Sequence, residues 1–481
     1  MILFNFSYYL LLILISLPLL CSIILFLIPK QNKLILKKIS LIFSFIILFN
    51  SILVWINFNP ILFKFQMYNS FIWSFNKTYY LNIGIDYISL FFIILTSFLI
   101  IICFIYNWNN ILVYLKEYLI ILFLLEFFLF LIFISLDLLL LYFLFESILI
   151  PMFLLIGIWG SKVKKIRAAY LFFFYTLFGS IGFLIAIIYI YKKYQITSYP
   201  LLFWIQFTKI EEICLWFAFF LSFAAKVPMI PFHIWLPEAH VEAPTSGSVL
   251  LAGILLKLGV YGFLRFLIPL FPYANNYFLP FIYSLSIISI VYAALVAIRQ
   301  IDLKKIIAYS SISHMNLIIL GLFSMNSIGL QGSILQSLSH GFIASGLFLL
   351  IGFLYDRYHT RILKYYSGLI QLMPIFSFFF IFFIFSNIAI PGTSSFTGEF
   401  LILIGSFLIN KSVTFLGATG MIFGGMYSLW LLNKVIYGNF KNNSIILTYD
   451  LTYREFYILS LLMFFILYLG LSPNILLNIL N

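Results

Sequence analysis

The sequence predicts an all-α polytopic membrane protein with about fourteen transmembrane helices. Of its 481 residues, 64% are hydrophobic and only 9% are charged, and the mean hydropathy is +1.15. This composition excludes a water-soluble globular protein of any class. Apolar runs of about 18 residues or more recur along the chain, and each can cross a hydrocarbon core of about 30 Å as a helix. Barrel strands are excluded because they are about half as long.

The apolar runs locate the predicted spans in chain order. Their centres fall near residues 18, 46, 96, 126, 147, 180, 222, 257, 288, 314, 341, 390, 423 and 466. The first run lacks the features of a signal peptide, so we expect it to remain as a span. Basic residues favour the odd-numbered connections between spans and are densest at Lys162, Lys164, Lys165 and Arg167. The positive-inside rule then places these connections toward the matrix or cytoplasm and both chain ends on the opposite side.

Two of the predicted spans are interrupted. The seventh contains Pro228 and Pro231, and the twelfth contains Pro391 followed by Gly392. Broken helices at corresponding positions of two halves are typical of inverted repeats that function at the unwound turns. The predicted organisation is a three-helix N-terminal region (1–110), a first inverted repeat of helices 4–8 (111–270), a second of helices 9–13 (278–436) and a C-terminal helix (437–481).

Ionisable residues inside the spans are the main functional candidates, because a charge at the bilayer centre costs about 2.5–3.5 kcal/mol on insertion scales. These residues are Glu126, Glu146, Lys226, Lys257, His314, His340 and Glu399. Burial disfavours the charged form of a lysine and a nearby carboxylate favours it, so proton affinity depends on where the partner lies. Histidine can bridge such groups because its unperturbed pKa is nearest neutrality. The set therefore indicates a proton relay.

A structural interpretation stays open for most of these residues. Glu146 and Lys226 could form one static ion pair between helices. His314 and His340 could be histidines satisfied at helix contacts, and Glu399 could cap a half-helix.

The remaining ionisable residues in the spans have different interpretations. Lys257 has no obvious partner nearby in sequence, which favours a function. Glu126 fits either a pair across helices or a polar groove. Arg265 lies near the end of a span, and we expect it to snorkel to the interface.

A metal site is not expected. His233, Glu238, His240 and Glu242 supply suitable ligand atoms, but Pro237 interrupts the helix that would align them. The sequence also lacks a P-loop and a dinucleotide fingerprint, and it shows no basic pattern typical of nucleic-acid binding. We therefore expect no metal, nucleotide or nucleic acid on this chain.

The chain resembles the proton-translocating membrane subunits of respiratory complex I in the segment FAAKVPMIPFHIWLPEAHVEAPTSGSVLLAGILLKLGVYGFLR. Further similar segments are DLLLLYFLFESILIPMFLLIGIWG, RQIDLKKIIAYSSISHMN, LSHGFIASGLFLLIGFLYDRYHTR and SSFTGEFLIL. The resemblance covers about residues 85–440. Within this family it points to mitochondrial chain 4, because the related chain 5 has a lysine in place of the FTGEF carboxylate.

The resemblance implies specific roles. Glu146 and Lys226 would be the input pair of the proton half-channel, and Lys257 would be the central lysine of the relay. His314 and His340 would be the connecting histidines, and Glu399 would be the carboxylate on the output side. NADH, flavin, iron-sulfur clusters and ubiquinone would be held elsewhere in the complex, so no cofactor is expected on this chain. The implied partners are chains 5 and 2 of the membrane arm, accessory subunits and membrane phospholipid, with cardiolipin as a candidate.

The resemblance also implies the mitochondrial inner membrane, with both chain ends in the intermembrane space. The chain contains 60 phenylalanines and 32 tyrosines, but only 25 glycines and 15 prolines. This bias toward residues with AT-rich codons indicates synthesis within the organelle. Two alternatives stay open. The chain could be a subunit of a multisubunit cation/proton antiporter, which shares these motifs, or a structural spacer of the membrane arm.

Overall fold

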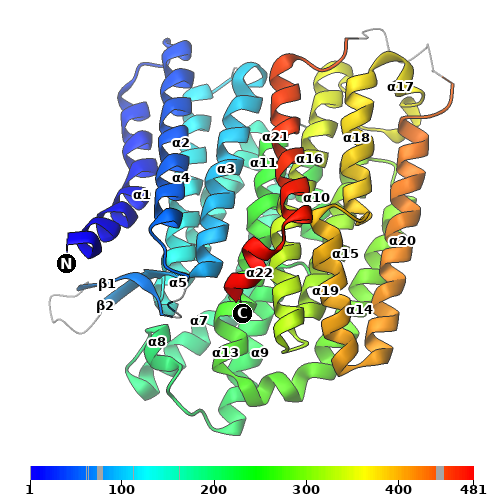
Figure 1. Ribbon diagram of the computed structural model, residues 1–481. Coiled ribbons are helices and arrows are strands. Elements are labelled where there is room, and N and C mark those ends of the chain that lie inside the picture. The colour runs from blue at the N-terminus through cyan, green and yellow to red at the C-terminus, as the bar shows by residue number, and fades with distance from the viewer. Residues whose placement is uncertain are drawn as a thin grey trace.

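The computed structural model describes residues 2–60, 62, 64–72, 80–111, 113–161, 163–439 and 449–480. In this part of the chain, long helices pack side by side into one bundle, with a single short β-hairpin at one face (Figure 1). Twelve helical segments among the described residues are long and apolar enough to cross a membrane. The multi-span helical prediction is therefore confirmed. Lys162, one of the clustered basic residues, lies outside the described residues.

The N-terminal region carries the hairpin between its second and third helices. Its elements are α1 (Ile2–Leu27), α2 (Lys33–Ile56), β1 (Gln66–Ile72), β2 (Tyr80–Ile85) and α3 (Tyr87–Asn110). The two strands pair antiparallel. They occupy a connection between spans, so the membrane-crossing part stays helical.

The seventh predicted span is broken where its prolines lie. The elements of this region are α4 (Leu115–Ile134), α5 (Leu138–Ser147), α6 (Leu149–Trp159), α7 (Lys165–Tyr194), α8 (Tyr199–Leu202), α9 (Lys209–Lys226), α10 (Trp235–Glu242), α11 (Thr245–Leu250), the π-helix η1 (Leu251–Leu255), α12 (Leu256–Gly262), the π-helix η2 (Phe263–Leu267) and α13 (Ile268–Leu270). Pro228 and Pro231 lie between α9 and α10. The helix is interrupted here because proline lacks a backbone donor and clashes with the preceding helical turn.

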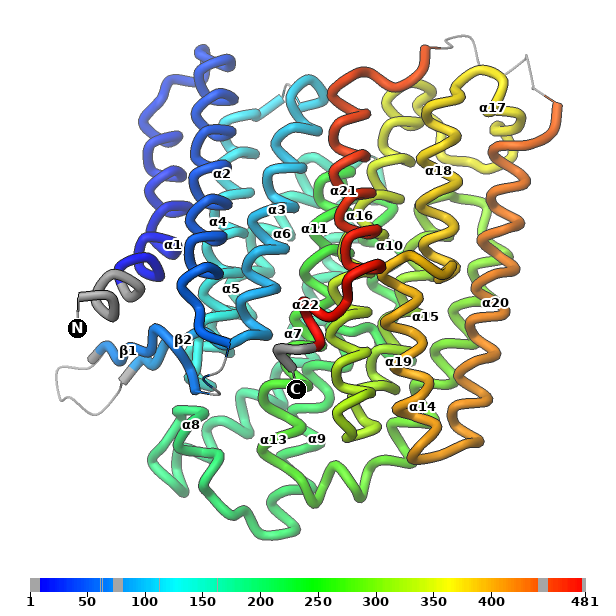
Figure 2. Tube along the Cα trace, in the orientation of Figure 1, coloured from blue at the N-terminus to red at the C-terminus, as the bar shows by residue number. Residues whose placement is uncertain are grey.

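The twelfth predicted span is broken between α18 and α19. The elements of this region are α14 (Pro272–Arg299), α15 (Leu303–Leu322), α16 (Ser327–Tyr358), the 3₁₀-helix η3 (Leu363–Tyr365), α17 (Leu369–Leu372), α18 (Pro374–Asn387), α19 (Ser394–Ile409), α20 (Lys411–Val435), α21 (Tyr453–Leu471) and α22 (Asn474–Leu480). Gly392 in the break has a φ of 94°, which favours glycine. Figure 2 traces the path from the blue N-terminal helices to orange α20 at the other end of the bundle. The inverted repeats and the domain boundaries stay predictions.

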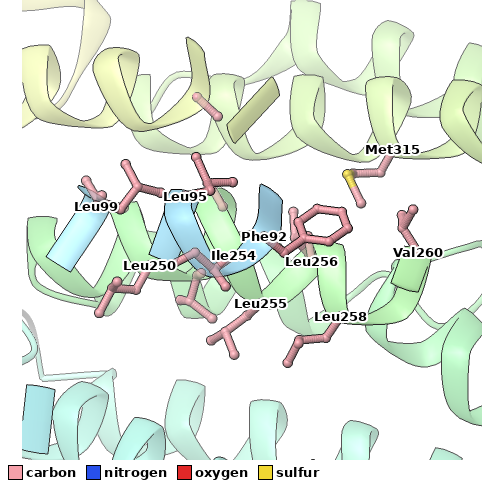
Figure 3. Close-up of a cluster of buried hydrophobic side chains, with 14 of the residues drawn as sticks. Phe92, Leu95, Leu99, Leu250, Ile254, Leu255, Leu256, Leu258, Val260 and Met315 are labelled. Carbon is pink, nitrogen blue, oxygen red and sulfur yellow. The ribbon is translucent and has the colours of Figure 1, made fainter. Parts of the chain in front are cut away.

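Two segments form the centre of the bundle. In the most apolar stretch of α16, 100% of the residues are buried within the chain. The corresponding share of buried residues is 94% for the run from α11 to α13 and 28% for α21. Figure 3 shows apolar side chains of α3, including Phe92 and Leu99, close to Leu250 and Ile254 in the buried hydrophobic cluster. This apolar packing surrounds the segment that carries Lys257 and keeps it in a low-dielectric environment.

Arg265 does not snorkel to the interface as predicted. Its side chain is buried on η2 and forms an ion pair with Asp86. Its guanidinium carbon lies 4.9 Å from the ring centroid of Phe65 and 5.8 Å from those of Tyr199 and Tyr261. The cation is retained inside the protein because an opposite charge and aromatic faces replace water.

Glu212 joins two helices and provides a test of the packing. Its Oε2 accepts hydrogen bonds from the backbone N–H of Tyr273 at 2.9 Å and of Ala274 at 3.1 Å, in the first turn of α14. We expect Glu212→Ala to lower the free energy of unfolding by about 1–2 kcal/mol, because these donors lose a charged acceptor. Chaotrope unfolding in detergent, followed by tryptophan fluorescence, measures this change. Glu212→Gln is the control and should lose less, since its amide oxygen still accepts; an equal loss in both variants would contradict the capping role.

Candidate functional site

Lys257 lies at the centre of the bundle, fully buried in α12. It stands between the π-helices η1 and η2, and such local widening of a helix is frequent at functional sites. Its Nζ donates a hydrogen bond to the backbone carbonyl of Ala252 and lies 2.8 Å from Nδ1 of His340 on α16. One partner is a fixed backbone acceptor and the other is a group that can take up a proton.

A series of polar groups continues from His340. The ring centroids of His340 and His314, which lies on α15, are 5.9 Å apart. His314 Nδ1 is 3.0 Å from Oε1 of Glu399 on α19. Four of the six predicted relay residues therefore form one connected series across α12, α16, α15 and α19.

Gln336 also belongs to this site and is not among the residues predicted from the sequence. Its Nε2 donates to Oε1 of Glu399 at 3.0 Å. Glutamine does not ionise, so a search for intramembrane charges passes over it. The usable signal is its spacing, since residues four apart on a helix share a face and Gln336 precedes His340 by four residues.

A cavity borders the Glu399 end of the series. His314, Ser313 and Glu399 line it together with Asn387, the last residue of α18, and Gly420 of α20. The break between α18 and α19 thus lies next to the carboxylate. An interrupted helix is tolerated inside a membrane protein where it borders such a cavity.

Glu146 and Lys226 form a separate cluster. Lys226 is the last residue of α9 and is buried, and its Nζ lies 3.4 Å from the ring centroid of Phe145. In the described part of the chain, Nζ of Lys226 and Oε1 of Glu146 are both buried without a hydrogen-bond partner. Glu146 still acts on Lys226 electrostatically. The two residues are neighbours and are not joined by a hydrogen bond.

Glu126 lies apart from both clusters. It is buried on α4, and within the described residues neither of its carboxylate oxygens has a hydrogen-bond partner. It acts electrostatically on Cys21 of α1, the helix that packs against α4. This geometry assigns it no place in the series.

Two further buried groups interact with this series or lie beside it in the packing of the helices. His240 on α10 is fully buried, and its ring stacks on Phe348 with centroids 4.6 Å apart. Lys304, in the first turn of α15, is also fully buried and donates to the carbonyl of Ala243 at 3.0 Å. A lysine near a helix end is usually exposed, but here α10 packs against α15. No group of three or more His, Cys, Asp or Glu among the described residues could hold a metal ion.

The comparisons with known proteins agree with this architecture. The family model described as NADH:quinone oxidoreductase/Mrp antiporter, transmembrane, matches residues 135–426. NADH-ubiquinone oxidoreductase chain 4 of Chondrus crispus is 54% identical over 461 residues, which cover 96% of this chain and 94% of the relative. The chain belongs to the NADH-ubiquinone oxidoreductase chain 4 family. Chain 4 of Marchantia polymorpha is 52% identical and is covered to 94%, with 97% of this chain aligned.

Solved structures share the fold of this chain 4 family member. A chain in the structure of respiratory complex I from Thermus thermophilus with bound NADH has a TM-score of 0.85 and 25% identity, with 98% of both chains covered. A chain of the membrane-bound sulfane sulfur reductase, an archaeal respiratory membrane complex, has a TM-score of 0.86 at 23% identity. It is covered to 77%, with 98% of this chain aligned, and shows the fold alone. The family resemblance predicted from the motifs is confirmed, and all six predicted relay residues lie within residues 135–426.

Proposed function

We propose that this chain 4 family member is a core membrane-arm subunit of respiratory complex I that translocates protons across the mitochondrial inner membrane. NADH oxidation and ubiquinone reduction on other subunits would drive it. The observation that carries the proposal is the series from Lys257 through His340 and His314 to Glu399. The names of the relatives in Chondrus crispus and Marchantia polymorpha support it.

The contacts suggest how one proton moves along the series. The Lys257 ammonium gives a proton to Nδ1 of His340, while its hydrogen bond to Ala252 keeps the resulting amine in place. His340 releases a proton from its other ring nitrogen toward His314, a step that one water molecule can bridge. His314 then protonates Oε1 of Glu399, next to the cavity.

The Glu146 and Lys226 cluster fits the input role. Because no hydrogen bond joins the two residues, their separation can change without breaking one. Moving the carboxylate toward Lys226 favours the lysine ammonium, and moving it away favours the neutral amine. A change of charge on Lys226 alters the field at Lys257, since charges interact strongly in a low-dielectric interior.

The partners and location follow from the same proposal. We infer that chains 5 and 2 lie beside this subunit, with accessory subunits and phospholipid such as cardiolipin around it. The chain would lie in the mitochondrial inner membrane with both ends in the intermembrane space and would be synthesised in the organelle. NADH, flavin, iron-sulfur clusters and ubiquinone would be bound by other subunits.

Purification of the chain separates this proposal from the antiporter alternative. We expect an affinity-tagged chain, solubilised in mild detergent, to elute with flavin and with NADH:ubiquinone reductase activity. Elution without flavin, together with cation/proton exchange by membranes assayed without added NADH, would instead assign the chain to an antiporter. A tagged unrelated membrane protein of the same membrane provides the background for the eluted flavin.

A further inference from the structure

A polar cavity lies at one face of the bundle, apart from the relay. Tyr106, Asn110, Thr245, Asp356 and Arg361 contribute to its lining. These residues come from the connections and helix ends that follow the third, seventh and eleventh predicted spans. Such odd-numbered connections carry most of the basic residues, which is the pattern of the matrix side. The end of α3, which carries Tyr106 and Asn110, lies at the face opposite the β-hairpin, toward the top of Figure 1.

Asp356 is a partly buried carboxylate in this lining. Its Oδ2 accepts hydrogen bonds from the Tyr106 hydroxyl and from Nδ2 of Asn110, each at 2.7 Å. Both donors belong to the last turns of α3, so the carboxylate has a defined position on the cavity wall. It is a proton acceptor in contact with the cavity.

Lys304 and His240 together interact both with a group of this cavity and with groups of the relay. Lys304 also hydrogen-bonds to Ala243, two residues before the cavity-lining Thr245. Lys304 interacts electrostatically with Asp356 on one side and with His240 on the other. His240 in turn interacts with Lys257 and His340. Both ring nitrogens of His240 are buried without a hydrogen-bond partner in the described part of the chain, so neither is committed to a structural contact.

The helices hold these groups in order. His240 stacks on Phe348, which lies two helical turns beyond His340 on the same helix α16. Lys304 donates to Ala243 at the end of α10, the half-helix that carries His240. The matrix-side half of the broken seventh span therefore places an unpartnered imidazole beside a buried ammonium group.

We propose that this cavity is the matrix-side inlet of the relay, with Asp356 as the first proton acceptor and Lys304 and His240 as carriers to Lys257. This inference rests on the proposed function. A proton from the matrix enters through water in the cavity and binds to the Asp356 carboxylate. The Lys304 ammonium passes a proton to a ring nitrogen of His240 and regains one from the Asp356 carboxyl group. The His240 imidazolium then protonates the neutral amine of Lys257, so one matrix proton reaches Lys257 and the three carriers return to their starting states.

The test uses assembled complex I in proteoliposomes. We expect Asp356→Asn to lower NADH-driven proton pumping and turnover at least threefold, with normal assembly on native gels, because the amide cannot take up a proton. Asp356→Glu should recover at least half of the lost rate. Glu117→Gln is the matched control, since Glu117 pairs with Lys30 near the same face and does not belong to this route.

Two results distinguish failure of the inlet from failure of the proposed function. Wild-type pumping in Asp356→Asn and in Lys304→Met, in a complex that Lys257→Met blocks, would overturn the inlet and leave the relay intact. Unchanged pumping in Lys257→Met would overturn both.

A second variant keeps the inlet testable should Asp356→Asn fail to assemble. Ser161 lines the same cavity and hydrogen-bonds to Arg361. In submitochondrial particles, which expose the matrix side, a negatively charged membrane-impermeant thiosulfonate should slow turnover of Ser161→Cys at least threefold. An equal rate with and without the reagent, when mass spectrometry shows the cysteine modified, would overturn the inlet.

Discussion

Replacing Lys257 with methionine is expected to abolish proton pumping by the assembled complex and to lower NADH-driven turnover at least tenfold. Methionine has similar length and volume, so the packing around α12 changes little. The variant removes the ammonium group that lies 2.8 Å from Nδ1 of His340 and can give it a proton. Protons translocated per electron in proteoliposomes measure the effect, with a native gel to show that the complex is intact.

Two variants support the interpretation of the Lys257 result. Lys257→Ala should also lose pumping, although it adds a cavity in a fully buried position. Lys411→Met removes an exposed lysine at the start of α20 and should pump normally. An unchanged stoichiometry in Lys257→Met would favour the structural-spacer alternative, in which the chain only maintains the membrane arm.

Replacing Glu399 with glutamine is expected to lower pumping at least fivefold. Oε1 of Glu399 accepts from Gln336 and lies 3.0 Å from Nδ1 of His314. Glutamine is nearly isosteric and its amide oxygen can still accept hydrogen bonds, but it cannot take up and release a proton. The loss therefore reports proton transfer rather than packing. Pumping rate and assembly are measured as for Lys257.

A double-mutant cycle shows whether Glu399 and His314 act as one unit. If a proton passes between them, His314→Gln combined with Glu399→Gln should cost little more than either change alone. Glu117→Gln is the control acid and should pump normally, since Glu117 pairs with Lys30 and belongs neither to the series nor to the proposed inlet. Fully additive losses would show that Glu399 and His314 act independently.

Static pairing explains the cluster at Glu146 poorly. A fixed ion pair holds two helices together through close contacts between charged atoms, and the buried Arg357 and Glu455 show this arrangement at 2.6 Å. Lys226 instead faces the ring of Phe145, while one carboxylate oxygen of Glu146 is buried without a hydrogen bond among the described residues. Buried charges without close partners are costly, so their retention favours a function over a structural role.

Local patterns in the sequence were sufficient to predict a multi-span helical protein and the two places where proline interrupts a helix. However, twelve helical segments among the described residues, rather than fourteen, are long and apolar enough to cross a membrane. A span can be predicted from the hydropathy of a sequence window about as long as the span itself. Pro228 and Pro391 each interrupt a helix through the covalent geometry of proline. The candidate charges could also be found this way, because Lys257 and Glu399 lie inside apolar runs where a charge is costly.

The contacts within the site were decided by tertiary structure alone. Lys257 meets His340, and Gln336 supports Glu399, because helices far apart in sequence pack against each other. The same packing buries Lys304 and pairs Arg265 with Asp86, although each cation lies near a helix end where exposure is the usual outcome. The sequence determines the cost of each buried charge. Only the arrangement of the helices decides which group offsets that cost and where a proton can pass.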